Sequence, residues 1–264
     1  MDLLTALKTS FSTLRTNWRI SLASFSQTQI LAYSSPTTSS AYHLYFTKTR
    51  TLSHPSDLLG VHIERNKEDG SIHLTQQGLA EQIVAAMHLD DPSIDPVNTP
   101  ATDYLPIDER GELQHETFIY ALVVRQQLNY LAGHSRCDIT FATSQVTKYL
   151  HRSRRLHGLA LIQIGQHLEG TLNKGLILRP SNTESLKIDL YVDAAFACGW
   201  QVEDSTNPES VKSRTGNIIE MANFPVLWVS KEQSSVATST MESKYTALSM
   251  ASSSPSISSS RTSL

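Results

Sequence analysis

Two acidic residues stand near the ends of predicted secondary structure elements, where carboxylates can take part in chemistry. Asp193 closes a run from Leu186 in which apolar and polar residues alternate, as in a half-buried strand. Glu242 lies near the start of a segment with helical spacing. Hydrolysis of a phosphodiester with two metal ions needs several carboxylates around ions about 4 Å apart. Taken alone, Asp193 is better explained as a turn-forming acid and Glu242 as an acid that complements the helix dipole.

A second group that could do chemistry is a local run of basic residues. Its members are Lys148, His151, Arg152, Arg154, Arg155 and His157. Such a cluster can bind the phosphates of a nucleic acid, or it can be a solvated helix end whose cations complement the helix dipole. The formal net charge is −3. Any binding of nucleic acid must therefore come from a local patch of this kind.

The elements before residue 180 are predicted to be a hairpin followed by helices. Residues 58–65 and 71–76 alternate as two strands around a turn at Gly70. Leu79, Ile83 and Met87 line one face of the helix that follows. After a Pro-containing loop, three more helices are predicted. They cover residues 117–133, ending at Gly133 as a left-handed cap; 138–150, capped by Asp138; and 156–170, weakened by Gly165 and closed by Gly170.

A new domain is predicted to begin after Pro180. Strand patterns cover residues 186–192, 216–221 and 225–230, and residues 239–251 have helical spacing through Met241, Tyr245, Leu248 and Ala251. Residues 252–264 form a low-complexity tail to which no structure is assigned. The predicted domains are therefore 57–180 and 181–251.

The first 56 residues differ in composition from the rest. Residues 3–56 contain neither Asp nor Glu and are rich in Ser and Thr. This is typical of a disordered segment, either a translated unrelated reading frame or an organelle transit peptide. Cys137 and Cys198 are far apart and no apolar run reaches about 20 residues. We therefore expect neither a disulfide framework nor a membrane partner, and an intracellular protein, cytoplasmic or nuclear.

Several short motifs occur in one order between about residues 58 and 251. They are LLGVHIER, GSIHLTQ, VNTPA, RQQLNYLAG, SRCDITFATSQVTKYL, HLEGTLNKGL, YVDAAFA, KSRTGN, VLWVSKEQ and STMESKYTAL. In sequence and spacing they resemble the C-terminal part of the Pol polyprotein of copia-type LTR retrotransposons. The resemblance implies a mixed α/β (α+β) fold. Residues 57–180 would be a reverse transcriptase thumb and connection region, and 181–251 an incomplete RNase H-like sheet with one helix.

The resemblance also implies roles for particular residues. Asp193 in YVDAAFA matches the first metal-binding Asp of the RNase H site, and Glu242 in STMESKYTAL matches the Glu of its first helix, so both are implied ligands of Mg²⁺. The family has a second acid where this chain has Ala195, and its remaining ligands lie beyond residue 251. Its polymerase aspartate pair lies upstream of residue 58, where no such pair occurs. Asp90 and Asp91 are adjacent but follow a helix.

Three functions follow from these observations. The first is a catalytically inactive fragment of a retrotransposon Pol, decayed at both ends. The second is a metal-dependent ribonuclease H acting on RNA–DNA hybrids. The third is a repurposed module that binds nucleic acid or Pol. The implied partner is an RNA–DNA hybrid or a template–primer duplex, contacted through Lys148, Arg152, Arg154 and Arg155. The oligomeric state stays open.

Overall fold

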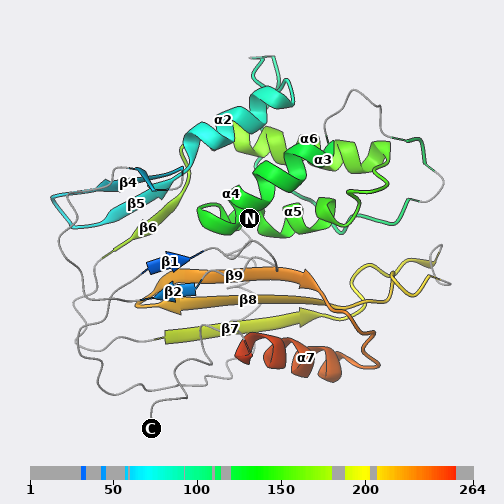
Figure 1. Ribbon diagram of the computed structural model, residues 1–264. Helices are drawn as coiled ribbons and strands as arrows, with labels where there is room; N and C mark the ends of the chain where they lie inside the picture. The colour runs from blue at the N-terminus through cyan, green and yellow to red at the C-terminus, as the bar shows by residue number, and fades with distance from the viewer. Residues whose placement is uncertain are drawn as a thin grey trace, which may run out of the picture. The chain divides into compact units, whose positions relative to one another are not determined.

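The computed structural model contains both α-helices and antiparallel β-strands, so the mixed α/β prediction is confirmed (Figure 1). It describes residues 31–33, 43–45, 57–58, 60–91, 93–108, 111–113, 120–179, 188–202 and 207–253. The chain divides into two compact units. The described parts of the first unit lie within Ser56–Pro180 and Ala197–Lys212, and the main described parts of the second lie within Ser181–Phe196 and Ser213–Leu264.

Little of the N-terminal segment is described. Within residues 1–56 the structure gives β1 (Leu31–Tyr33) and β2 (His43–Tyr45), which pair antiparallel. The predictions for the rest of this segment, and for the tail after residue 253, fall outside the described residues.

The predicted hairpin forms the centre of the sheet in the first unit. The strands of this sheet, in the order in which they pair, are β3 (Asp57–Leu58), β4 (Val61–Arg65), β5 (Ile72–Thr75) and β6 (Leu176–Leu178). Neighbouring strands are all antiparallel. Gly70 adopts a φ of 72°, which an L side chain would resist, at the predicted turn. The amide of Asn66 then donates to the carbonyl of Ser71 and closes that turn.

Helices build the core of the first unit. They are α2 (Gln77–Ala86), α3 (Tyr120–Leu122), the π-helical turn η1 (Val123–Leu128), α4 (Asn129–His134), the 3₁₀ turn η2 (Cys137–Ile139), α5 (Thr140–Thr147) and α6 (Arg155–Glu169). Ile83 and Met87 are buried in this core, as predicted. A Cβ at Gly165 would lie 2.3 Å from Met87 Cε, so this glycine allows α6 to pack closely against the end of α2. Gly170 caps α6 as predicted, in a right-handed conformation.

Two predicted helix boundaries are wrong. Gly133 lies inside α4, which ends at His134, and the cap is Ser135, whose amide donates to the carbonyl of Leu131. Gly133 is not among the residues with positive φ, so it is not a left-handed cap. Asp138 does not cap α5, whose N-cap is Ile139. Its buried carboxylate is bound by the cations of Arg136 and Lys174 instead of helix amides.

The described part of the second unit contains a three-stranded antiparallel sheet, in the order β7-β8-β9, covered by one helix. Its elements are β7 (Ile188–Ala195), β8 (Arg214–Met221), β9 (Phe224–Glu232) and α7 (Thr240–Ser252). Ala222 and Asn223 form the two-residue turn between β8 and β9 with φ values of 52° and 66°, matching a type I′ turn. Figure 1 shows α7 lying along the sheet beside β7.

Small residues face the sheet from α7. Ser243, Ala247 and Ala251 are buried, whereas Met241 and Tyr245 are 64% and 65% exposed. Gln233 joins this helix to the sheet, since its Nε2 donates to Thr215 Oγ1 at 3.0 Å and to the carbonyl of Ser243 at 2.8 Å. The face of α7 was not apparent from its spacing, because the helix contacts the sheet through its smallest side chains. No helix in the described part of the chain has the length and apolarity to cross a membrane.

Candidate functional site

Asp193 lies within β7, opposite Gly216 of β8. The strand continues through Ala195, so Asp193 is not a turn residue. Its side chain is 33% exposed, and Lys244 Nζ of α7 lies 3.7 Å from its Oδ1. The carboxylate that the resemblance assigns to a metal is thus accompanied by an ammonium group of the same chain.

Glu242 has the helix-start role that its position predicts. Ser239 is the N-cap of α7, and its Oγ accepts from the amide of Glu242 at 3.1 Å. The carboxylate of Glu242 turns back and accepts from the amide and the hydroxyl of Thr238, at 2.6 and 2.7 Å. These hydrogen bonds lower the pKa of Glu242. The contacts resemble a capping box and account for the side chain without a metal.

Strand β7, which carries Asp193, packs against α7, which carries Glu242. The two carboxylates nevertheless make separate contacts. Among the described residues, no three side chains of His, Cys, Asp or Glu gather where they could hold a metal ion. A two-ion centre needs several converging carboxylates. Asp193 contacts Lys244, and Glu242 contacts Thr238. This arrangement does not fit a Mg²⁺ centre built from Asp193 and Glu242.

The adjacent acids Asp90 and Asp91, which were not predicted to be catalytic, likewise have a local explanation. Asp90 and Asp91 are exposed after α2. Asp91 Oδ1 accepts from the amide of Ser93 at 2.8 Å, and hydrogen bonds from Ser93 lower the pKa of Asp91. This is the geometry of a side chain that stabilises a turn.

The basic run is divided between surface and core. Arg152 is exposed, and Arg155 is 73% exposed while its guanidinium lies 3.3 Å from the carboxylate of Glu112. Lys148 and Arg154 are half-buried, and Arg154 Nη1 donates to the carbonyl of Gly111 at 3.1 Å. The four predicted phosphate-binding residues therefore differ in how much of their charge faces solvent.

His157, a member of the basic run, does not lie at the surface with the other cations. It is buried, and its ring stacks on Tyr149 with centroids 3.7 Å apart. Its Nδ1 accepts from the amide of Arg154 at 3.0 Å, at the start of α6. Burial lowers the pKa of His157, because the charged imidazolium would be poorly solvated there. The neutral ring therefore serves the helix start.

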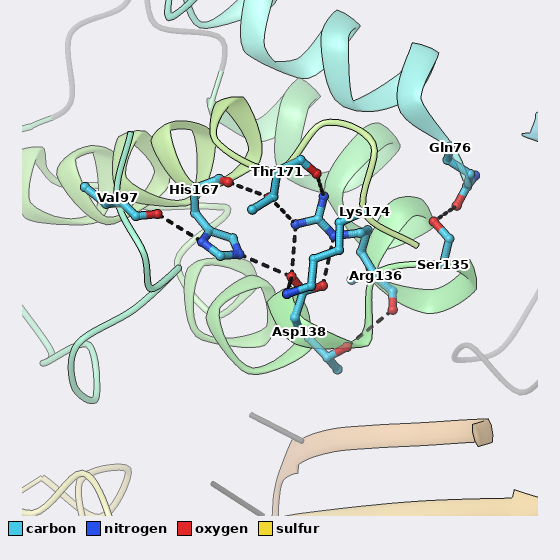
Figure 2. A network of polar contacts seen from close by, with 10 residues as sticks. Gln76, Val97, Ser135, Arg136, Asp138, His167, Thr171 and Lys174 are labelled. Atoms are coloured by element: carbon cyan, nitrogen blue, oxygen red, sulfur yellow. Dashed lines mark hydrogen bonds and ion pairs between the residues drawn. The ribbon is translucent and has the colours of Figure 1, made fainter. Parts of the chain in front are cut away.

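The sequence did not reveal a buried polar network in the first unit, drawn in Figure 2. Arg136 is 1% exposed, and its Nε and Nη2 donate to the two carboxylate oxygens of Asp138, each at 2.9 Å. The same guanidinium donates to the carbonyl of Thr171 at 2.9 Å and to its hydroxyl at 2.6 Å. Lys174 Nζ lies 3.2 Å from Asp138 Oδ2. The network thus ties η2 to the turn that follows α6.

His167 extends this network to Val97, in the loop between α2 and α3. Its Nε2 lies 3.2 Å from Asp138 Oδ2, and its Nδ1 lies 3.1 Å from the carbonyl of Val97. The ring thus lies between the carboxylate of Asp138 and the backbone at Val97. The short spacing of Arg136 and Asp138 was visible in the sequence, but their partner His167 lies 29 residues beyond Asp138.

The charge of Asp138 is stabilised by its partners. Burial by itself would raise the pKa of Asp138, but hydrogen bonds from His167 and Arg136 and the charges of Arg136 and Lys174 hold it well below its ordinary range. Both carboxylate oxygens are occupied by side chains of the same unit. The network is therefore built to hold segments together.

The sequence is similar to three retrovirus-related Pol polyproteins from transposons. It is 29% identical over 185 residues to that of transposon RE1 of Arabidopsis thaliana and 28% identical over 185 residues to that of RE2, covering 69% of this chain and 12% of each relative. It is 25% identical over 207 residues to that of TNT 1-94 of Nicotiana tabacum, covering 75% of this chain and 14% of the relative. No family model and no solved structure matches the chain. The chain is thus a sequence relative of the retrovirus-related Pol polyproteins of copia-type transposons, and it spans 12–14% of their length.

Proposed function

We propose that this chain is a section of a retrotransposon Pol polyprotein that does not catalyse phosphodiester hydrolysis by itself. In this proposal residues 57–180 are a reverse transcriptase thumb and connection-like region, and residues 181–251 are an RNase H-like region. The similarity to Pol polyproteins supports the origin. The antiparallel sheet with α7 beside the strand of Asp193 is compatible with the second assignment.

The proposed lack of catalysis rests on one observation, namely the contacts that the carboxylates of Asp193 and Glu242 make. Hydrolysis with two ions needs carboxylates free to converge on them. The carboxylate of Asp193 lies against the ammonium of Lys244, and that of Glu242 is held by two hydrogen bonds from Thr238. Ala195 has no oxygen ligand to add to them.

A cleavage assay tests this function. The full chain is incubated with an RNA–DNA hybrid carrying a labelled RNA strand, in Mg²⁺ or Mn²⁺, beside an Asp193→Asn variant of matched circular dichroism. We expect the same background from both proteins. Metal-dependent cleavage that disappears in the Asp193→Asn variant would establish the ribonuclease alternative and refute the proposal.

Binding of nucleic acid without chemistry is the second candidate, and the exposed cations of the basic run favour it. The ion pair between Arg155 and Glu112 is weak, because both side chains are largely exposed to solvent, at 73% and 77%. Arg152 is also exposed. Guanidinium groups of this kind suit phosphate oxygens. We propose that these two residues would contact the backbone of an RNA–DNA hybrid, with Lys148 and Arg154 at the margin.

The test for binding is the salt dependence of affinity for the hybrid. A double variant, Arg152→Ala with Arg155→Ala, should lower the slope of log K against log salt by about 1 for each phosphate contact that is lost. Lys67→Ala, at an exposed lysine in the turn of the hairpin, is the control for charge alone. An unchanged slope in the double variant would remove this candidate.

A further inference from the structure

We propose that Lys244 is a built-in counter-ion of Asp193 that keeps divalent cations off this carboxylate. This inference goes beyond the proposed function, since it concerns cation binding whatever the surrounding polyprotein does. It also assigns position 244, instead of position 242, as the place from which α7 faces Asp193.

The geometry of α7 separates the two candidate positions. Successive residues of an α-helix are about 100° apart around the axis, so Glu242 and Lys244 lie about 200° apart. Ser243, between them, is fully buried against the sheet. Glu242 and Lys244 therefore flank the buried face on opposite sides. Lys244 is the one whose side chain reaches Asp193, with Nζ 3.7 Å from Oδ1.

The contacts of Glu242 hold it on its own side of the helix. Its carboxylate accepts from both the amide and the hydroxyl of Thr238, and its amide donates to Ser239 Oγ. To reach Asp193 the carboxylate would have to give up both hydrogen bonds that it accepts from Thr238. Capping thus commits Glu242 to a structural role and leaves position 244 to face the strand.

The charge of Lys244 opposes a metal ion at this place. A divalent ion binds a carboxylate oxygen at about 2.0–2.6 Å. It would then lie close to an ammonium that is itself 3.7 Å from that oxygen. Because Lys244 is 48% exposed, it can swing away, so the effect is competition between cations and not a sealed site. We expect the exclusion to be limited, with affinity changes of about tenfold, equivalent to 1.4 kcal/mol.

Binding of Mn²⁺ to the full chain, measured by calorimetry and by loss of the free-ion electron paramagnetic resonance signal, tests the inference. The proteins are the natural chain, Asp193→Asn, Lys244→Gln and Lys244→Glu, and each of the two Lys244 variants combined with Asp193→Asn. We expect the natural chain to bind no more tightly than an Asp193→Asn variant. Lys244→Gln should bind more tightly, and Lys244→Glu should gain at least about tenfold in affinity, because it replaces a repelling charge with a second carboxylate.

Controls separate this result from a change in overall charge. Lys231→Glu makes the same substitution at an exposed lysine of β9, which lies beyond β8 from the strand of Asp193, and should leave Mn²⁺ binding unchanged. Gln, Glu and Lys have similar helix propensities, so α7 should persist in each variant, as checked by circular dichroism. The inference is overturned if Lys244→Gln and Lys244→Glu bind Mn²⁺ no better than the natural chain, or if their gain survives Asp193→Asn. Cleavage is not the readout, so this result is independent of the proposed function.

Discussion

Arg136 holds both carboxylate oxygens of Asp138 in a bidentate pair at 2.9 Å, although the two residues stand only two positions apart and both are buried. The backbone at Cys137 makes a 3₁₀ turn that lets both side chains point the same way. Lys174 adds a second cationic group around the same carboxylate, and His167 Nε2 lies 3.2 Å from its Oδ2. The buried carboxylate of Asp138 therefore links η2 to α6 and to the turn that follows α6.

Replacing that anion should be costly. Asp138→Asn leaves the guanidinium of Arg136 buried without its counter-charge, and loss of one partner of a buried pair typically costs about 3–5 kcal/mol. We expect a decrease of this size in the free energy of unfolding, measured by urea denaturation. Asp90→Asn, at an exposed acid, is the matched control and should change stability by less than about 0.5 kcal/mol. A small effect for Asp138→Asn would show that Asn restores the contacts.

The same residue predicts sensitivity to acid. The pKa of Asp138 is lowered in the folded chain from an ordinary value of 3.8, although burial opposes this, because His167 and Arg136 bind the charged form. The unfolded chain then binds the proton more readily, so the stabilisation is present above pH 3.8 and is lost as the pH falls below it. Unfolding in urea at several pH values should show this loss. The Asp138→Asn variant should have a flatter profile between pH 4 and 2.

His157 predicts a second pH dependence nearer neutrality. Burial lowers its pKa from 6.5, and its Nδ1 accepts a hydrogen bond from Arg154 that a protonated Nδ1 cannot accept. Stability should therefore be full above pH 6.5 and decline as the pH falls below that value. His157→Gln, which retains an acceptor, should reduce this slope. His134, whose pKa burial also lowers, should contribute in the same direction, and His134→Gln measures its share.

The contact between α6 and the end of α2 predicts opposite effects of one substitution at two glycines. Gly165→Ala places a Cβ 2.3 Å from Met87 Cε and 2.4 Å from Leu89 Cδ1, so the core must shift. Overpacking of this kind should lower the free energy of unfolding by about 1–3 kcal/mol. At Gly78, in α2, a Cβ meets nothing within 4 Å, so Gly78→Ala should be neutral or stabilising by up to about 1 kcal/mol. Equal effects at both sites would contradict the packing described.

Local patterns in the sequence were enough for most of the elements. Alternation and the turn at Gly70 predicted the hairpin of β4 and β5, and apolar spacing predicted α2 with Ile83 and Met87 in the core. The three strands and the helix of the second unit were also predicted, because each depends on neighbours within a few residues. The ends of helices were predicted less accurately than the helices themselves. Gly133 could end a helix, but tertiary packing continued α4 past it.

Side-chain partners were decided by tertiary structure. The sequence predicted Asp138 as a helix cap and placed His157 in a basic run, and the family resemblance implied that Glu242 is the helix residue paired with Asp193. The fold supplied His167 to Asp138, buried His157 against Tyr149, and turned Lys244 toward Asp193. The physical reason is one of range. Periodicity and capping act over a few residues of chain, whereas the partner of a charge depends on which helix face meets which strand, and packing between distant segments determines that.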